Sequence, residues 1–178
     1  MVITLIGYRG SGKSTVAAGL AARLGCDWTD ADSVIEQAAG KTIREIFESE
    51  GEPGFRRRER EAIAGLLQRD KLVLAAGGGA ILNADTRREM QAAGPVVWLQ
   101  ASAGVLAGRI AADPATAARR PNLAGGGLDE ITRLLAEREP LYRECAKLSI
   151  FTDQLAVPEI VERIAVAVAA RHSRGGGR

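Results

Sequence analysis

The chain has 178 residues, of which 46% are hydrophobic, so it is long enough for one domain with a substantial core and too apolar to be disordered. Its 24 basic and 22 acidic residues give a net charge of +2, which argues against a protein that binds nucleic acid or a membrane surface. Cys26 and Cys145 lack metal-ligand or redox spacing, and no signal peptide or membrane-spanning segment is visible. We therefore expect a cytoplasmic protein with reduced thiols, and we expect a monomer.

Short apolar runs alternate with stretches of helical periodicity along the chain. In chain order, we expect a strand at 2–6, a helix at 14–24, a strand ending at 29–32, helices at 32–38 and 42–48, a longer helix at 53–68, a strand at 72–75, a helix at 83–92, a strand at 95–99, a helix at 103–111, a helix at 128–144, a strand at 148–151 and a helix at 158–170. This alternation favours a three-layer α/β fold, in which helices flank a five-stranded parallel sheet.

Periodicity is lost between residues 113 and 127, where two prolines, Arg119, Arg120 and three consecutive glycines occur. This composition predicts a mobile loop, which we interpret as a lid. We expect one domain over residues 1–172, with acceptor-binding helices at about 31–62 and a flexible tail at 173–178.

Residues 7–14 match the P-loop pattern Gly-x4-Gly-Lys-Ser in full, and they lie between an expected strand and an expected helix. In such a loop, backbone N–H groups and the N-terminal end of the helix bind phosphate. Lys13 would reach the β- and γ-phosphates of ATP, and Ser14 would offer its hydroxyl to Mg²⁺. The sequence therefore predicts a P-loop kinase fold that binds ATP with Mg²⁺.

Two carboxylates, Asp30 and Asp32, close the second expected strand. On an extended stretch, residues two apart point to the same side, so these carboxylates would share one side. One can help to hold Mg²⁺ through water, and the other can accept a hydrogen bond from a substrate hydroxyl. The alternative interpretation is that Asp32 is a helix N-cap, a position that aspartate favours.

The helix expected at 53–68 carries a charged pair, Arg56 and Glu59, beside its apolar face. Charges at such a place cost free energy unless they are paired or bind a ligand. A structural ion pair and a ligand-binding role therefore both stay open.

Two further features follow later in the chain. The glycine triplet at 77–79 ends an expected strand, where glycine lets a ligand approach the backbone closely. Arg138 by itself would suit a surface ion pair with a neighbour such as Glu137.

Taken together, these motifs resemble the shikimate kinase family over roughly residues 1–160. The resemblance is carried, in order, by Gly10-Ser11-Gly12-Lys13-Ser14-Thr15, Asp30-Ala31-Asp32 with Ile35-Glu36, Ile43-x-x-Ile46-Phe47, Gly51-Glu52-x-x-Phe55-Arg56-x-x-Glu59, Gly77-Gly78-Gly79, Arg120-Pro121-x-Leu123, and Arg138-x-Pro140-Leu141-Tyr142. The elements around Arg56 and Arg138 are more specific than the P-loop, which many kinases share.

The resemblance implies transfer of the ATP γ-phosphate to the 3-hydroxyl of shikimate, giving shikimate 3-phosphate on the route to chorismate and the aromatic amino acids, with Mg²⁺ as cofactor. The residues that it implies as catalytic are Lys13, Asp32 and Arg120. ATP would be bound by Gly10, Ser11, Gly12, Lys13, Ser14, Thr15, Arg109 and Arg120, and the metal by Ser14 and Asp30. Shikimate would be bound by Asp32, Arg56, Glu59, Gly77, Gly78, Gly79 and Arg138.

The chain departs from the family pattern at Asn122, where a leucine is usual, and the stretch from Arg109 to Arg120 is a few residues longer than typical. The loop at 152–154 also lacks the basic residue that some members place by the adenine. One alternative is a kinase for another small acceptor, such as gluconate or a nucleoside monophosphate. The other is a non-catalytic nucleotide-binding module, which would not need the acceptor-site groups.

Overall fold

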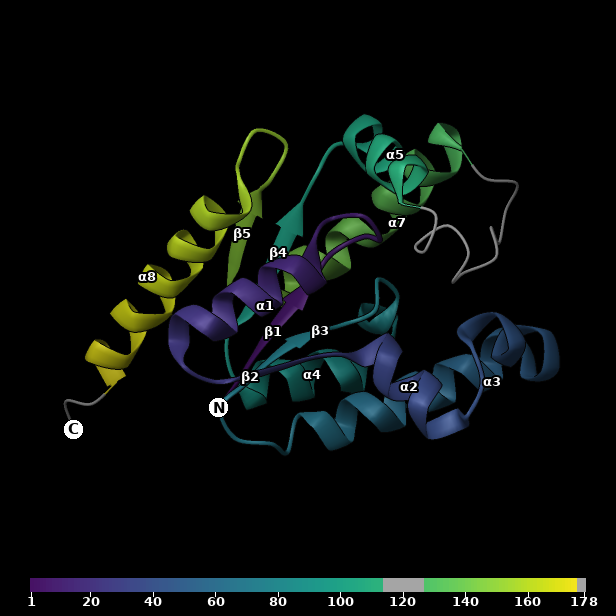
Figure 1. The fold of residues 1–178 in the computed structure, drawn as a ribbon, viewed down its shortest axis with the longest axis horizontal. Helices are drawn as coiled ribbons and strands as arrows, with labels where there is room; N and C mark the ends of the chain where they lie inside the picture. Colours follow the sequence, from purple (N-terminus) through teal and green to yellow (C-terminus); the bar gives the residue numbers. More distant parts are fainter. Residues whose placement is uncertain (114–126, 176–178) are drawn as a thin grey trace.

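A computed structural model of the chain describes residues 1–113 and 127–175, with side chains described up to residue 170. Its five strands are parallel and form one sheet in the order β2-β3-β1-β4-β5 (Figure 1). They are β1 (Val2–Ile6), β2 (Asp27–Asp30), β3 (Leu72–Ala75), β4 (Val96–Gln100) and β5 (Leu148–Phe151). The predicted five-stranded parallel sheet is confirmed.

Helices cover both faces of this sheet and extend beyond its carboxyl edge (Figure 1). The described helices are α1 (Lys13–Leu24), α2 (Ala31–Ala39), α3 (Ile43–Leu66), the 3-10 helix η1 (Ala80–Leu82), α4 (Ala84–Ala93), α5 (Ala103–Ala112), α7 (Leu128–Cys145) and α8 (Val157–Gly175). None of the helices in the described ranges is long and apolar enough to span a membrane.

Successive side chains of a strand point to opposite faces of the sheet, so one short strand contributes to the core on both faces. Along β1, Ile3 and Leu5 pack with α1 and α8, whereas Val2 and Ile6 pack with α4 and α7 on the opposite face. Because both faces are covered, β1 is buried along its whole length, and four of its five residues are apolar.

The winding of the sheet reverses at β1, which has β3 on one side and β4 on the other. In open parallel sheets, ligands bind beyond the carboxyl ends of the strands at such a reversal. The loop after β1 is the P-loop. In Figure 1, α2 and α3 lie on one side of this loop, and α5 and α7 lie on the other.

The helix that carries Arg56, α3, is bent. It spans the two helices predicted at 42–48 and 53–68, and the bend lies between them. α3 begins with a capping box, in which Thr42 and Glu45 each bond the other's backbone N–H, and it bends at Gly51, whose φ is 67°. Beyond the bend, Phe55 packs with Ile35, Ile43 and Ile46 in a small apolar cluster of its own. This cluster fixes the second half of α3 against α2.

Several predicted boundaries are wrong. The second strand ends at Asp30, not at residue 32, because α2 begins at Ala31. The last helix runs to Gly175, so the tail predicted at 173–178 overlaps it by three residues, and residues 176–178 lie outside the described part. The 3-10 helix η1 was not predicted, and residues 114–126 of the predicted lid lie outside the described residues.

Candidate active site

The P-loop joins the end of β1 to the start of α1 over residues 7–12. Gly12 is the N-cap of α1 and has a φ of 87°, a left-handed backbone conformation that residues with a Cβ rarely adopt. The Lys13 ammonium donates hydrogen bonds to the Gly7 and Tyr8 carbonyl oxygens, both at 2.9 Å. The lysine charge is therefore held against the loop itself.

A cavity of about 280 Å³ opens at this loop, and we call it the P-loop cavity. Its lining includes ten of the residues proposed from the sequence: Gly10, Gly12, Lys13, Ser14, Thr15, Asp30, Asp32, Gly77, Gly78 and Arg109. Ser11, also in the loop, does not line the cavity and is buried. Arg120 lies outside the described residues.

Asp30 contacts both the P-loop and the next helix. One of its carboxylate oxygens accepts a short hydrogen bond from the Ser14 hydroxyl, and the other accepts from the Asp32 backbone N–H at 2.9 Å. Asp30 is thus the N-cap of α2, and Asp32 stands in the first turn of that helix. The expectation that the two carboxylates share an extended stretch is wrong, and so is the alternative that Asp32 is the cap. Both still reach the same cavity.

The oxygen groups at this corner suit Mg²⁺ in number and kind. Mg²⁺ keeps several waters and is bound by one or two protein groups together with substrate phosphates. The described residues contain no group of three or more His, Cys, Asp or Glu side chains that could hold a metal alone. The Ser14 hydroxyl and the Asp30 carboxylate, already in contact, match the smaller requirement.

Arg109 comes from α5 and is tied to the loop after β5. Its guanidinium donates to the Thr152 hydroxyl and to the Thr152 carbonyl, both at 3.2 Å. Thr152 is buried and is itself bonded to Gln100 at the end of β4. The planar group is therefore fixed at the rim of the P-loop cavity, where a flat ligand could stack on it.

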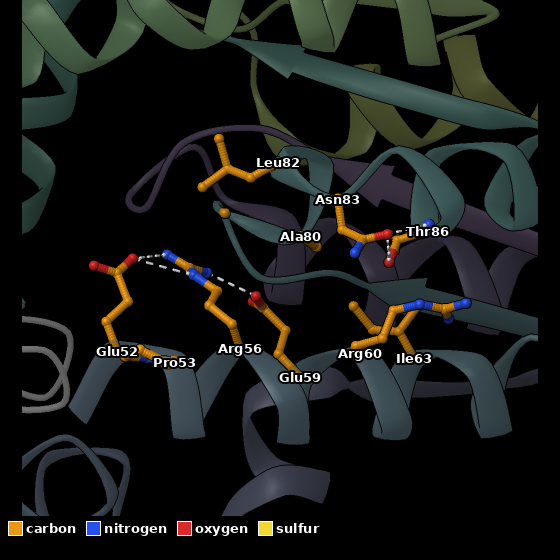
Figure 2. A pocket seen from close by; sticks show the side chains of 11 residues that line it. Glu52, Pro53, Arg56, Glu59, Arg60, Ile63, Ala80, Leu82, Asn83 and Thr86 are labelled. Atoms are coloured by element: carbon orange, nitrogen blue, oxygen red, sulfur yellow. Dashed lines mark hydrogen bonds and ion pairs between the residues drawn. The ribbon is translucent and has the colours of Figure 1, made fainter. Parts of the chain in front are cut away.

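A second cavity, of about 480 Å³, lies between the second half of α3 and the η1–α4 segment (Figure 2), and we call it the α3 cavity. Arg56 projects into it from α3 and is bonded on both flanks. Its Nη1 donates to Glu59 at 2.6 Å, and its Nη2 donates to Glu52 at 3.0 Å. The predicted Arg56–Glu59 pair is confirmed, and Glu59 is buried, which fits its predicted place beside the apolar face of the helix.

Gly79 borders the α3 cavity and is in close contact with the Arg56 guanidinium. A Cβ atom at residue 79 would lie 2.2 Å from Nη1 and 2.6 Å from both Cζ and Nη2. The Nη1–Cζ–Nη2 end of the guanidinium therefore occupies the space that a side chain at residue 79 would need. Only glycine leaves room for the arginine in this position.

Arg138 approaches the neighbouring residue from α7. Its Nη1 is 3.5 Å from the Gly78 carbonyl oxygen, and its guanidinium lies over the Tyr8 ring, 5.8 Å from the centroid. The interpretation of Arg138 as the partner of Glu137 is wrong, because Glu137 pairs with Arg133 at 2.8 Å.

The residues at 77–79, which we call the glycine loop, separate the two cavities. Gly77 and Gly78 line the P-loop cavity, and Gly79 lines the α3 cavity. Arg56 and Arg138 therefore contact successive residues of one loop although they lie on different helices. A small molecule over this loop could reach both arginines and a phosphate group at the P-loop.

The family model for shikimate kinase matches residues 9–169. The chain belongs to the shikimate kinase family. It is 45% identical to a shikimate kinase of Rhodopirellula baltica over 90% of this chain and 86% of that one, and 40% identical to a shikimate kinase of Symbiobacterium thermophilum over 98% and 100%. Among solved structures, shikimate kinase from Acinetobacter baumannii in complex with shikimate has a TM-score of 0.89 and 37% identity, covering 96% of this chain and 93% of that chain.

Sequence reasoning missed several contacts in this shikimate kinase family site. Glu52, one turn before Arg56, carried a usable signal, because residues four apart on a helix form ion pairs. Tyr8, which lies under Arg138, occupies a variable position of the P-loop pattern and gave no signal. Burial raises the pKa of its phenol, so it stays neutral. Thr152 gave none either, since its partner Arg109 is 43 residues away.

We expect Gly79→Ala to raise the KM for the acceptor at least about tenfold, because a Cβ there would displace the Arg56 guanidinium. The KM for ATP should stay within about twofold, since residue 79 does not line the P-loop cavity. Steady-state kinetics with each substrate varied in turn measures both. Gly65→Ala on α3 is the matched control, because a Cβ there meets no atom within 4 Å. An unchanged acceptor KM in Gly79→Ala would contradict the argument that glycine at residue 79 makes room for the Arg56 guanidinium.

Proposed function

We propose that this chain transfers the γ-phosphoryl group of ATP to the 3-hydroxyl of shikimate, giving shikimate 3-phosphate. The observation that carries the proposal is the convergence of Arg56 and Arg138 on successive residues of the glycine loop, directly beside the P-loop cavity. Two guanidinium groups suit one carboxylate, because each offers paired N–H donors to its oxygens. Membership of the shikimate kinase family supports the same acceptor.

On the donor side, the chain would bind the phosphates with the P-loop N–H groups and Lys13. On nucleotide binding, the Lys13 ammonium would exchange its Gly7 and Tyr8 carbonyl partners for phosphate oxygens. Ser14 and Asp30 would hold Mg²⁺, which neutralises charge on the phosphates when it is bound. Arg109, fixed by Thr152, would flank the adenine.

On the acceptor side, the proposed work is positioning. Asp32 lines the P-loop cavity and would accept a hydrogen bond from the attacking hydroxyl. Arg56 and Arg138 would hold the carboxylate at the other end of the ring, with Glu59 orienting Arg56. Fixing both ends places the hydroxyl for in-line attack, which is where most of the rate of phosphoryl transfer arises.

The acceptor is tested by comparing ADP release in a coupled assay with shikimate, gluconate, a nucleoside monophosphate or no acceptor. Of these acceptors, we expect only shikimate to be turned over. A nucleoside monophosphate has no carboxylate for the two arginines, and the open chain of gluconate does not hold its carboxylate and hydroxyl at the fixed separation that a ring provides. Equal or faster turnover with gluconate or a nucleoside monophosphate would replace the proposed acceptor. ADP release that no acceptor stimulates would argue for a nucleotide-binding module.

The carboxylate clamp is tested by Arg56→Ala and Arg138→Ala. Each should raise the KM for shikimate by about 10- to 150-fold, the worth of a hydrogen bond to a charged group, and should leave ATP affinity nearly unchanged. Matched controls are Arg57→Ala, an exposed neighbour on α3, and Arg133→Ala, an exposed arginine on α7 paired with Glu137. Neither control should shift either KM by more than about twofold. Variants at 56 and 138 that lose thermal stability but bind shikimate normally would make these arginines structural.

We further propose that Arg120 joins the phosphates when the lid closes over both substrates. On this proposal, Arg120→Ala lowers kcat at least about 100-fold while nucleotide affinity of the free enzyme falls far less. Single-turnover kinetics and nucleotide titration, with Arg119→Ala as the control, measure the two effects. Equal losses in both would make Arg120 a ligand of bound ATP in the ground state.

A further inference from the structure

Tyr142 forms a buried hydrogen bond to the glycine loop that the proposed mechanism leaves unused. The side chain is fully buried on α7, and its hydroxyl donates to the Gly78 carbonyl oxygen at 2.6 Å. Its ring stacks on Trp98 of β4, with centroids 5.4 Å apart and planes 19° from parallel. Tyr142 therefore ties the loop between the two cavities to the centre of the sheet.

The direction of this bond fixes the orientation of a whole peptide group. A peptide unit is planar and trans, so the Gly78 C=O and the Gly79 N–H point in opposite directions. Because the carbonyl points to Tyr142 in the interior, the Gly79 N–H is directed away from α7. Gly79 is also the residue against which the Arg56 guanidinium packs closely. A turn of this peptide would alter the surface on which that arginine rests.

The same carbonyl oxygen is also approached by Arg138, one turn earlier on α7. Its Nη1 is 3.5 Å away, at the outer limit of a hydrogen bond, whereas the Tyr142 bond is short. Leaving a buried carbonyl without any hydrogen-bond donor costs free energy. Conformations in which a nearby donor bonds to it are therefore favoured. While Tyr142 donates to the Gly78 carbonyl, Arg138 can move away and the carbonyl still has a hydrogen-bond donor.

We propose that Tyr142 is a positioning residue for the acceptor: it satisfies the Gly78 carbonyl, which frees Arg138 to bind the acceptor carboxylate and keeps the glycine loop in register with Arg56. This inference rests on the proposed function of the two arginines as a carboxylate clamp. Tyr142 itself touches no substrate, because it is covered by the loop and by Trp98. Its effect passes through the Gly78 carbonyl and Arg138.

The test begins with Tyr142→Phe, which keeps the ring and its stack on Trp98 and removes only the hydroxyl. We expect the KM and the dissociation constant for shikimate to rise about tenfold, because the unsatisfied carbonyl now holds Arg138. The KM for ATP should change by less than about twofold, since Tyr142 does not border the P-loop cavity. A substitution that only destabilised the fold would lower the melting temperature and would not raise the KM for shikimate selectively over the KM for ATP.

A double-mutant cycle with Arg138→Ala supplies the sharper readout. In the Tyr142→Phe background, Arg138 is already drawn to the Gly78 carbonyl, so removing it should cost several-fold less in shikimate affinity than it costs in the unsubstituted chain. Thr4→Val is the matched control. It also removes a buried hydroxyl, but this one lies on β1 and outside both cavities. That variant should leave both substrate constants unchanged.

The possible outcomes separate the inference from the function on which it rests. Turnover of shikimate by the unsubstituted chain tests the proposed function. If that turnover is absent, both the proposed function and the inference about Tyr142 fail. If that turnover is present, an unchanged shikimate KM in Tyr142→Phe overturns the inference. So does an equal rise in the KM values of both substrates, or a strictly additive double mutant. A selective rise together with non-additivity supports it.

Discussion

The geometry of the site depends on the close contact between the glycine loop and the P-loop. A Cβ on Gly78 would lie 3.3 Å from the Gly7 carbonyl oxygen and 3.4 Å from the Arg9 backbone nitrogen. The two loops meet backbone to backbone, with no flexible side chain between them. Phosphoryl transfer needs the reacting atoms about 3–3.5 Å apart, and a backbone contact holds such a separation more firmly than a side-chain contact does. This one backbone contact therefore fixes the proposed donor and acceptor sites relative to each other.

Beside this contact, Arg56 of the proposed acceptor site is paired with two glutamates that differ in exposure. Glu59 has a side chain only 4% exposed, and it bonds Arg56 from within the core, where breaking the pair would leave a buried charge. Glu52 bonds the other flank but is 49% exposed, so water can solvate it when it leaves. A guanidinium has five N–H donors, and these glutamates use three of them. Within the described residues, Arg56 thus combines one permanent partner with one that can be exchanged.

What the sequence predicted and what it missed follow from the range of the interactions. The P-loop, the alternation of strands with helices and the Arg56–Glu59 pair are local patterns, so they were predicted and the structure contains them. The contacts of the glycine loop join residues about sixty apart, from Gly78 to Arg138 and Tyr142, and no local pattern encodes such a distance. The triplet was a weak signal on its own, because glycine marks close approach but not what approaches.

The error at Asp30 and Asp32 shows how a local rule can hide a longer coupling. Two carboxylates two residues apart suggested one extended stretch, but an aspartate that ends a strand can also begin a helix. Asp30 does this with one oxygen while its other oxygen binds Ser14 at the start of α1. The first turn of α2, with Asp32 in it, is consequently tied to the P-loop helix. α2 packs against α3, which carries Arg56. If Ser14 changes its partner on nucleotide binding, as proposed, that change is connected through the Asp30 carboxylate to the helices of the proposed acceptor site.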